Sequence, residues 1–299
     1  FMKFIQFNKF YSLFNIFSIT LILISILFLV IKGLNFGVDF KGGTLIELRT
    51  NNNIQISNIR DAFGKMNLGD VSVKNFGNEN DYIIKFEKKN SNDPNFITEI
   101  KDELSKSIGN NFDIRRVENV GPKVSAELLK SGIIAIGLSL AAMLIYIWIR
   151  FEWQFSLGAI AALFHDVIIT LGIFSIFSLE INLSIVAAVL TIVGYSMNDT
   201  VVIFDRVREN LKKISDIKIF ELTNISINET LSRTIITSAT TLLALISIFI
   251  FGGEILKGFS FAMILGVIIG TYSSIYIANP ILVYLRVNYK TIIKEDKEK

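Results

Sequence analysis

The chain has 299 residues, of which 51% are hydrophobic and 19% charged, and its formal net charge at pH 7 is +3. Soluble domains carry about a quarter charged residues, so this apolar excess points to a membrane protein. The small net charge and the lack of a phosphate-binding glycine loop argue against nucleic acid and nucleotides as ligands. With no cysteine and one histidine, His165, the sequence predicts no disulfide, no metal site and no cofactor.

Six segments have the length and apolar character of membrane-spanning helices, which need roughly 20 residues to cross the hydrocarbon core. The first is too long for the core of a signal peptide, and no small-residue cleavage site follows it, so we expect it to remain as a span. The predicted fold class is an α-helical membrane protein with six transmembrane helices. The segments cover residues 12–31, 131–149, 155–177, 181–204, 234–251 and 258–285.

Lysine and arginine gather on one side of these spans. They occur before the first span, between the fourth and fifth, and after the sixth, whereas the loop after the third span has only Glu180. Because cytoplasmic loops are enriched in Lys and Arg, we expect both termini in the cytoplasm. The predicted organisation is a cytoplasmic N-terminus with the first helix at 2–32, an extracytoplasmic domain at 33–129, helices two to six at 130–285 with a cytoplasmic loop at 205–232, and a basic cytoplasmic tail at 286–299.

Residues 33–129 are polar and predict a small α+β domain between the first two spans. The order of its elements is βαββαβ, which is that of a ferredoxin-like fold. Since no nucleophile lies beside a base here, we interpret the domain as a structural or partner-binding module. Alternation predicts strands at 44–50, 71–76, 82–87 and 112–120, and helical spacing predicts helices at 56–66 and 93–108.

One carboxylate interrupts the fourth span. Asp199 lies in GYSMNDTVVIFDRVREN (194–210), a few residues before the cytoplasmic end of the span, and Arg233 opens the fifth span, which enters from the cytoplasm. The two residues should therefore lie at similar depth on antiparallel helices, where an ion pair offsets the desolvation of both charges. Ionisable residues inside spans usually serve function. We therefore predict that Asp199 relays protons and that Arg233 gates its charge, in preference to a purely structural ion pair.

The third span carries two more ionisable residues, His165 and Asp166. Adjacent helical residues point about 100° apart, so the two are not expected to face one partner equally. Asp166 is either a second relay group or a structural hydrogen-bond partner across helices, and the sequence leaves both open. Gly266 and Gly270 form a GxxxG pattern that predicts close helix packing. The polar groups expected near the depth of Asp199 include Ser196, Asn198, Thr237 and Ser238.

Several stretches of the sequence, taken in order, resemble the motifs of the SecD/SecF protein-export family. They are GVDFKGGT (37–44), VGPKVSAEL (120–128), FHDVIITLGIF (164–174), GYSMNDTVVIFDRVREN (194–210) and RTIITSATTL (233–242). The single small outer domain and the wording NDTVVIFDRVREN favour the SecF branch over SecD. Lys41 occupies a variable motif position where a neutral residue is common. The family motif near the membrane then falls on Asp39, Phe40, Gly42, Gly43 and Thr44.

The resemblance implies a function that the residue arguments do not reach, that of a membrane transport protein and not of an enzyme. Proteins of the SecF branch pair with SecD in the bacterial cytoplasmic (inner) membrane, work with the SecYEG channel and are similar to resistance–nodulation–division transporters. They use the proton motive force to help draw secreted polypeptides out of the channel. The implied partners are thus a SecD-like subunit, SecYEG, the translocating polypeptide and membrane lipid. The aspartate and arginine that the family ties to proton movement fall on Asp199 and Arg233.

Three other functions remain open on the sequence. A stand-alone proton-coupled exporter of hydrophobic solutes would use the same proton chemistry but bind its substrate in a pocket. An intramembrane aspartyl protease would use Asp166 and Asp199 as a carboxylate dyad, but such enzymes carry GxGD where this chain has YSMND. A structural scaffold of the translocon would tolerate neutral residues at Asp199 and Arg233.

Overall fold

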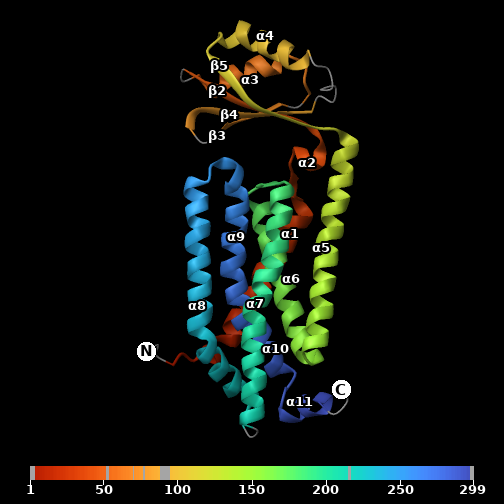
Figure 1. Cartoon of the computed structure of the whole chain (residues 1–299), viewed down its shortest axis with the longest axis vertical. Helices are drawn as coiled ribbons and strands as arrows, with labels where there is room; N and C mark the ends of the chain where they lie inside the picture. Colours follow the sequence, from red (N-terminus) through yellow and green to blue (C-terminus); the bar gives the residue numbers. More distant parts are fainter. Residues whose placement is uncertain are drawn as a thin grey trace. The chain divides into compact units, whose positions relative to one another are not determined.

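The computed structural model describes residues 4–51, 54–69, 71–76, 78–87, 95–214 and 217–296. The chain forms two compact units (Figure 1), one made of Phe1–Asn35 with Ile134–Lys299 and the other of Phe36–Ile133. The first unit is a helical bundle and the second is an α+β unit. Residues 93 and 94, where the sequence predicts the start of a helix, lie outside the described residues.

Among the residues that the structure describes, six helices are long and apolar enough to cross a membrane, as the sequence predicts. The last of them is interrupted, because α9 continues through a π turn, η2, into α10. The helices are α1 (Tyr11–Ile31), α5 (Pro122–Arg150), α6 (Trp153–Ile176), α7 (Leu183–Lys213), α8 (Ile219–Phe251), α9 (Glu254–Ser273), η2 (Ser274–Ala278) and α10 (Asn279–Tyr284). The shorter elements are η1 (Phe7–Phe10), β1 (Asn35–Phe36), β6 (Glu180–Ile181) and α11 (Tyr289–Asp296).

The spanning helices divide into interior and peripheral ones. In their most apolar 18-residue stretches, 56% of residues are buried in α6, 50% in α7 and 50% in the α9–α10 helix. The corresponding values are 11% for α1, 11% for α5 and 17% for α8. A helix that is apolar all round needs lipid or another protein against its exposed side. The three peripheral helices therefore offer their surfaces to the membrane or to a partner.

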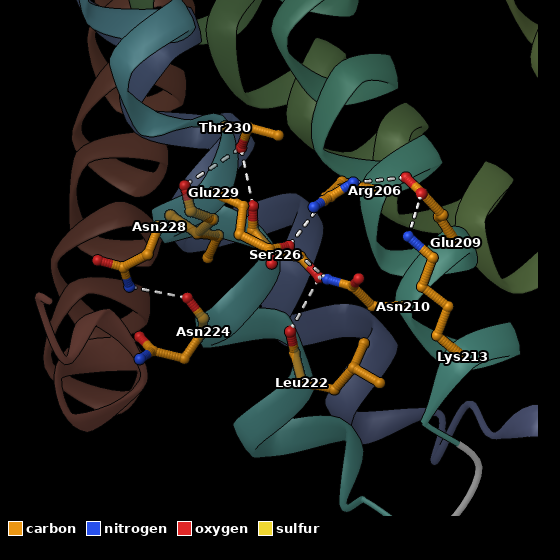
Figure 2. Close-up of polar contacts among 11 residues, drawn as sticks. Arg206, Glu209, Asn210, Lys213, Leu222, Asn224, Ser226, Asn228, Glu229 and Thr230 are labelled. Carbon is orange, nitrogen blue, oxygen red and sulfur yellow. Dashed lines mark hydrogen bonds and ion pairs between the residues drawn. The ribbon is translucent and has the colours of Figure 1, made fainter.

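The predicted loop at 205–232 is wrong, because both neighbouring helices continue into it. α7 runs on to Lys213, and α8 starts soon after it. Ion pairs at helical spacing support the end of α7, since Glu209 binds both Arg206 and Lys213 at 2.6 Å. Arg206 also binds Glu229 of α8 at 2.6 Å, so the two helix ends are tied together (Figure 2). The charged stretch that suggested a loop is thus a polar extension of two spanning helices.

The N-terminal segment packs on this extension of α8. Asn228 pairs with the backbone of Ile5, accepting from its N–H and donating to its carbonyl, both at 2.8 Å. Asn224 accepts from the N–H of Phe7 at 2.8 Å. Figure 2 shows both asparagines on the side of α8 that faces the N-terminal segment. These side chains satisfy backbone groups ahead of α1, which would otherwise need water.

Pro280 explains the interruption of the last spanning helix. Proline has no N–H, and in an α-helix its ring would crowd the carbonyl of Tyr276, four residues earlier. The backbone opens into the π turn, and Asn279 donates its side-chain amide to the carbonyl of Ser274 at 2.7 Å. π turns occur frequently at functional sites, and this one directly follows Ser273.

The α+β unit is a four-stranded antiparallel sheet with two helices on one face (Figure 1). Its strand order β3-β4-β2-β5 and its chain order βαββαβ confirm the predicted ferredoxin-like plan. Ile46 and Leu48 of the sheet share one buried core with Phe63, Ile100 and Leu104 of the helices. The elements are β2 (Gly43–Thr50), α3 (Ile56–Gly64), β3 (Val71–Phe76), β4 (Asn78–Phe86), α4 (Phe96–Ile108) and β5 (Phe112–Val120).

Candidate functional site

Asp199 lies in the interior of the bundle, on α7, with 3% of its surface exposed. Thr271 of α9 donates a hydrogen bond to its Oδ2 at 3.4 Å. The Thr271 hydroxyl lies 2.8 Å from that of Ser238 on α8, which accepts from the hydroxyl of Tyr195 at 3.5 Å. A chain of hydroxyl groups thus runs from the carboxylate to α8 and back to α7. Because a hydroxyl both donates and accepts hydrogen bonds, such a chain can pass a proton.

The predicted ion pair between Asp199 and Arg233 is absent from this structure. Arg233 is exposed, and in the described part of the chain no ion pair or hydrogen bond joins it to the carboxylate. Arg233 lies off the buried face of α8. That face follows the three- and four-residue spacing of a helix. Its residues here are Ile227, Leu231, Thr234 and Ser238.

Asp166 lies fully buried on α6 and joins three helices. Its Oδ2 accepts from Ser196 of α7 at 2.5 Å and from Ser273 of α9 at 2.8 Å. Its Oδ1 lies 2.8 Å from His165 Nδ1. The two adjacent side chains therefore contact each other, because the imidazole is long enough to reach the carboxylate although the two residues point in different directions from the helix. The geometry therefore provides the cross-helix hydrogen bonds expected of a structural role, and proton transfer at Asp166 stays a prediction.

His165 extends the Asp166 cluster towards α1. Its ring stacks on Tyr272 of α9, with ring centres 5.9 Å apart. Tyr272 shares a hydrogen bond with Ser18 at 2.7 Å and donates to the carbonyl of Phe14 at 2.9 Å, both on α1. The other ring nitrogen of His165, Nε2, is buried without a hydrogen-bond partner among the described residues. Tyr272 thereby connects the cluster to a fourth helix.

The other polar residues predicted around the fourth and fifth spans divide between the two clusters and the surface. Ser238 belongs to the hydroxyl chain, whereas Ser196 binds Asp166. Asn198 is exposed, and Thr237 donates to backbone carbonyls of its own helix. Two of the four residues therefore lie where they can assist a buried carboxylate.

Sequence reasoning missed Thr271 and Ser273, which supply the α9 side of both clusters. Glycines let α9 approach α7, since a Cβ on Gly270 would lie 3.0 Å from Ser196 Cβ, and one on Gly266 would also collide with α7. This supports the packing role predicted for the GxxxG pattern. Thr271 and Ser273 come soon after Gly270 in the sequence. Because a GxxxG pattern lets two helices approach closely, hydroxyl residues beside it could have been predicted to form hydrogen bonds with the neighbouring helix.

Asp166 and Asp199 do not form a carboxylate dyad. Each accepts hydrogen bonds from its own hydroxyl groups, and within the described ranges no hydrogen bond joins the two carboxyl groups. Aspartic proteases share one proton between carboxylates that lie side by side, which this arrangement does not provide. No group of three or more His, Asp and Glu side chains that could hold a metal ion occurs among the residues described.

The GxDFxGGT segment forms the entry to the α+β unit. It begins with the short helix α2 (Val38–Lys41), after which Gly42 and Gly43 have φ of +78° and +129°, the region that favours glycine. A Cβ on Gly43 would lie 2.6 Å from the carbonyl oxygen of Phe86. The backbone conformation therefore favours glycine at both positions, and the nearby carbonyl leaves no room for a side chain at Gly43. The other motif residues are Asp39 and Phe40 in α2 and Thr44 at the start of β2.

Family models and curated relatives match most of the chain. The model of the C-terminal part of SecD/SecF protein export membrane proteins matches residues 100–288, and the model of the SecD/SecF GG motif matches residues 27–54. The protein translocase subunit SecF of Rickettsia bellii is 48% identical over 280 residues, which cover 93% of this chain and 92% of the relative. The protein translocase subunit SecF of Cereibacter sphaeroides is 44% identical over 280 residues, which cover 91% and 86%.

Two solved structures share the fold. The crystal structure of SecDF from Thermus thermophilus, described as a translocon-associated membrane protein, matches 95% of this chain with a TM-score of 0.85 and 32% identity. SecDF in a super-membrane-facing form matches 100% of it with a TM-score of 0.72 and 30% identity. The chain spans 39% and 41% of the length of those SecDF chains. The agreement of motifs, fold and relatives means that the chain belongs to the SecD/SecF family of protein-export membrane proteins, in its SecF branch.

Proposed function

We propose that this chain is a proton-driven accessory subunit of the Sec protein translocase and works with a SecD-like partner. The observation that carries the proposal is the setting of Asp199, a carboxylate buried among spanning helices and joined to a hydroxyl chain. Ionisable groups inside spans are costly and mark ion pathways. The similarity to SecF subunits and to SecDF supports the partner and the pathway.

The exposed position of Arg233 supports a partner subunit against α8. A guanidinium keeps its charge at physiological pH, and a charge that faces lipid at membrane depth is costly. Asn198 of α7 and Thr240 of α8 are exposed as well. A SecD-like subunit with acidic or polar groups at this surface would satisfy these side chains and complete the path by which protons reach Asp199.

In the proposed cycle, a proton enters from outside, neutralises Asp199 and leaves to the cytoplasm. Charged Asp199 attracts Arg233, and protonation removes this attraction, so α7 and α8 change their mutual position with each proton. Rocking of one helix group against another is how alternating access operates in related membrane transporters. The movement would act on the α+β unit, which we place outside, where it holds the polypeptide that leaves the SecYEG channel.

Asp199→Asn is expected to lower proton-driven export of a secretory polypeptide in inverted membrane vesicles by about 100-fold, the scale of a lost proton-transfer group. The amide keeps the shape of the carboxylate but cannot carry its proton. Thr200→Val is the matched control, because the Thr200 hydroxyl donates to the carbonyl of Ser196 on its own helix at 3.2 Å. The control should stay within about twofold of wild type.

In vesicles that lack the SecD-like partner, proton-driven export should not differ among wild type, Asp199→Asn and Thr200→Val. Wild-type export by Asp199→Asn in complete vesicles would refute the relay.

We further propose that both termini and the α7–α8 connection lie in the cytoplasm and the α+β unit outside, from the distribution of Lys and Arg. The chain has no cysteine, so a single introduced cysteine reports its own accessibility. A membrane-impermeant maleimide applied from outside is expected to label Lys101→Cys on α4 and to spare Lys218→Cys before α8, both at exposed positions. The reverse labelling pattern would contradict this orientation.

A further inference from the structure

Two ion pairs hold the turn between α5 and α6 to α7. Arg150, the last residue of α5, binds Asp205 at 2.8 Å, and Glu152, just before α6, binds Arg208 at 2.9 Å. The side chain of Glu152 is 1% exposed, whereas those of Arg150 and Asp205 are 42% and 44% exposed. Asp205 and Arg208 are three residues apart on α7 and therefore share a face. We name these four residues the α5–α7 clamp.

An aromatic cluster supports the clamp on its buried side. Phe151, which lies between Arg150 and Glu152 in the turn, is 1% exposed, and its ring centre lies 6.1 Å from that of Phe204 on α7. Phe155 of α6 lies 5.2 Å from the same ring. The Arg150 guanidinium lies over the Phe151 ring, 4.9 Å from its centre, within cation–π range. Charge and packing together fix the turn to α7.

The remainder of α5 is held far less firmly. Ile147, one turn before the clamp, is the one hydrophobic residue of α5 that is buried among the described residues. Leu138 and Trp148 are 65% and 72% exposed. The helix is continuous from Pro122, directly after β5, to Arg150. α5 is therefore a long helix that leaves the α+β unit at one end and is anchored by the clamp at the other.

The anchoring helix α7 also carries Asp199. Asp205 follows six residues later on the same continuous helix, about 9 Å along its axis. A displacement of α7 at Asp199 is passed along the helix because its backbone hydrogen bonds keep it stiff. The clamp then transfers that displacement to the base of α5.

We propose that the α5–α7 clamp couples proton transfer at Asp199 to movement of the α+β unit, by making α5 follow α7. The inference rests on the proposed relay and adds residues that the relay does not contain. The four clamp residues are positioning residues, which act on export through α5. Their loss should separate two events that are otherwise linked, so that protons still pass while export falls.

The test measures proton flux and polypeptide export in the same inverted vesicles, with the complete translocase present. The double variant Glu152→Gln/Arg208→Gln removes the buried ion pair without leaving one buried charge unpaired. Export is expected to fall about tenfold, the scale of a lost coupling contact. Proton flux is expected to stay within about twofold of wild type.

The surface pair supplies a second set of variants, which decides the question if the buried variant does not accumulate. Arg150→Asp alone and Asp205→Arg alone should each lower export. The exchange Arg150→Asp/Asp205→Arg should restore it, because the ion pair forms again with its charges reversed. Two side chains with separate structural roles would not give such a rescue.

Three results would overturn the coupling. They are unchanged export in Glu152→Gln/Arg208→Gln, a parallel loss of proton flux and export in that variant, and a failure of the exchange to rescue. Asp199→Asn in the same vesicles separates this inference from the relay, since it should stop both flux and export. If Asp199→Asn stops neither, the relay is refuted, whereas the clamp variants by themselves refute only the coupling.

Discussion

Asp166→Ala is expected to lower the free energy of unfolding by about 2–6 kcal/mol, because two buried donors lose their acceptor and each costs about 1–3 kcal/mol when unpaired. The donors are Ser196 on α7 and His165 on α6, both almost fully buried, whereas Ser273 on α9 keeps a hydrogen bond to the carbonyl of Gly270 at 3.1 Å. The shorter side chain also leaves a cavity at the centre of the bundle. Heat unfolding in detergent, followed by tryptophan fluorescence, measures the loss.

Asp166→Asn separates the two roles that remain for this residue. Its carbonyl oxygen can keep both serine hydrogen bonds, and His165 can adopt the other tautomer to accept from the new amide. The expected loss is therefore about 1–2 kcal/mol, from the weaker acceptor. If Asp166 is structural, Asp166→Asn exports normally, and if it relays protons, export falls although the fold is kept.

Thr170→Val provides the control for both Asp166 variants. The Thr170 hydroxyl is buried on the same helix and donates to the backbone carbonyl of Asp166 at 2.8 Å, so its loss should cost about 1 kcal/mol. Equal unfolding free energies for Asp166→Ala and Asp166→Asn would contradict the hydrogen-bond account of this cluster.

Arg233→Gln is expected to lower proton-driven export by about 100-fold, as Asp199→Asn does, although the two side chains do not touch in this structure. Without the guanidinium, a change of charge on Asp199 exerts no force between α7 and α8. The long arginine side chain lies off the buried face of α8, so a rotation of this helix would turn it towards α7. Arg233→Lys should retain part of the export, since it keeps the charge but not the planar donor geometry.

The α+β unit could be predicted closely from the sequence because its pattern is local. Alternating residues and turn residues define its strands without knowledge of the rest of the chain. The largest departure is β4, which begins at Asn78, four residues before the strand predicted at 82–87. Pairing with β3 and β2 stabilises this extension, and such tertiary contacts override local preference.

The candidate site could be predicted only in part, because depth along a helix follows from counting residues but rotation about its axis does not. Counting residues along the two helices predicted that Asp199 and Arg233 lie at the same depth and form a pair. In the structure, the buried face of α8 includes Leu231 and Thr234 but not Arg233. The Asp166 cluster needs α6, α7 and α9 to meet at one point. The residue spacing within one helix does not show which other helices it contacts, so the roles of Ser273 and Thr271 were not predicted.

A double-variant cycle of Asp199 and Arg233 tests the central claim most directly. It compares proton-driven export in inverted vesicles for wild type, Asp199→Asn, Arg233→Gln and the double variant. Residues that act as one unit give losses that do not add, so each single variant should fall about 100-fold and the double variant no further. Losses that multiply in the double variant, or a single variant that exports like wild type, would contradict the account.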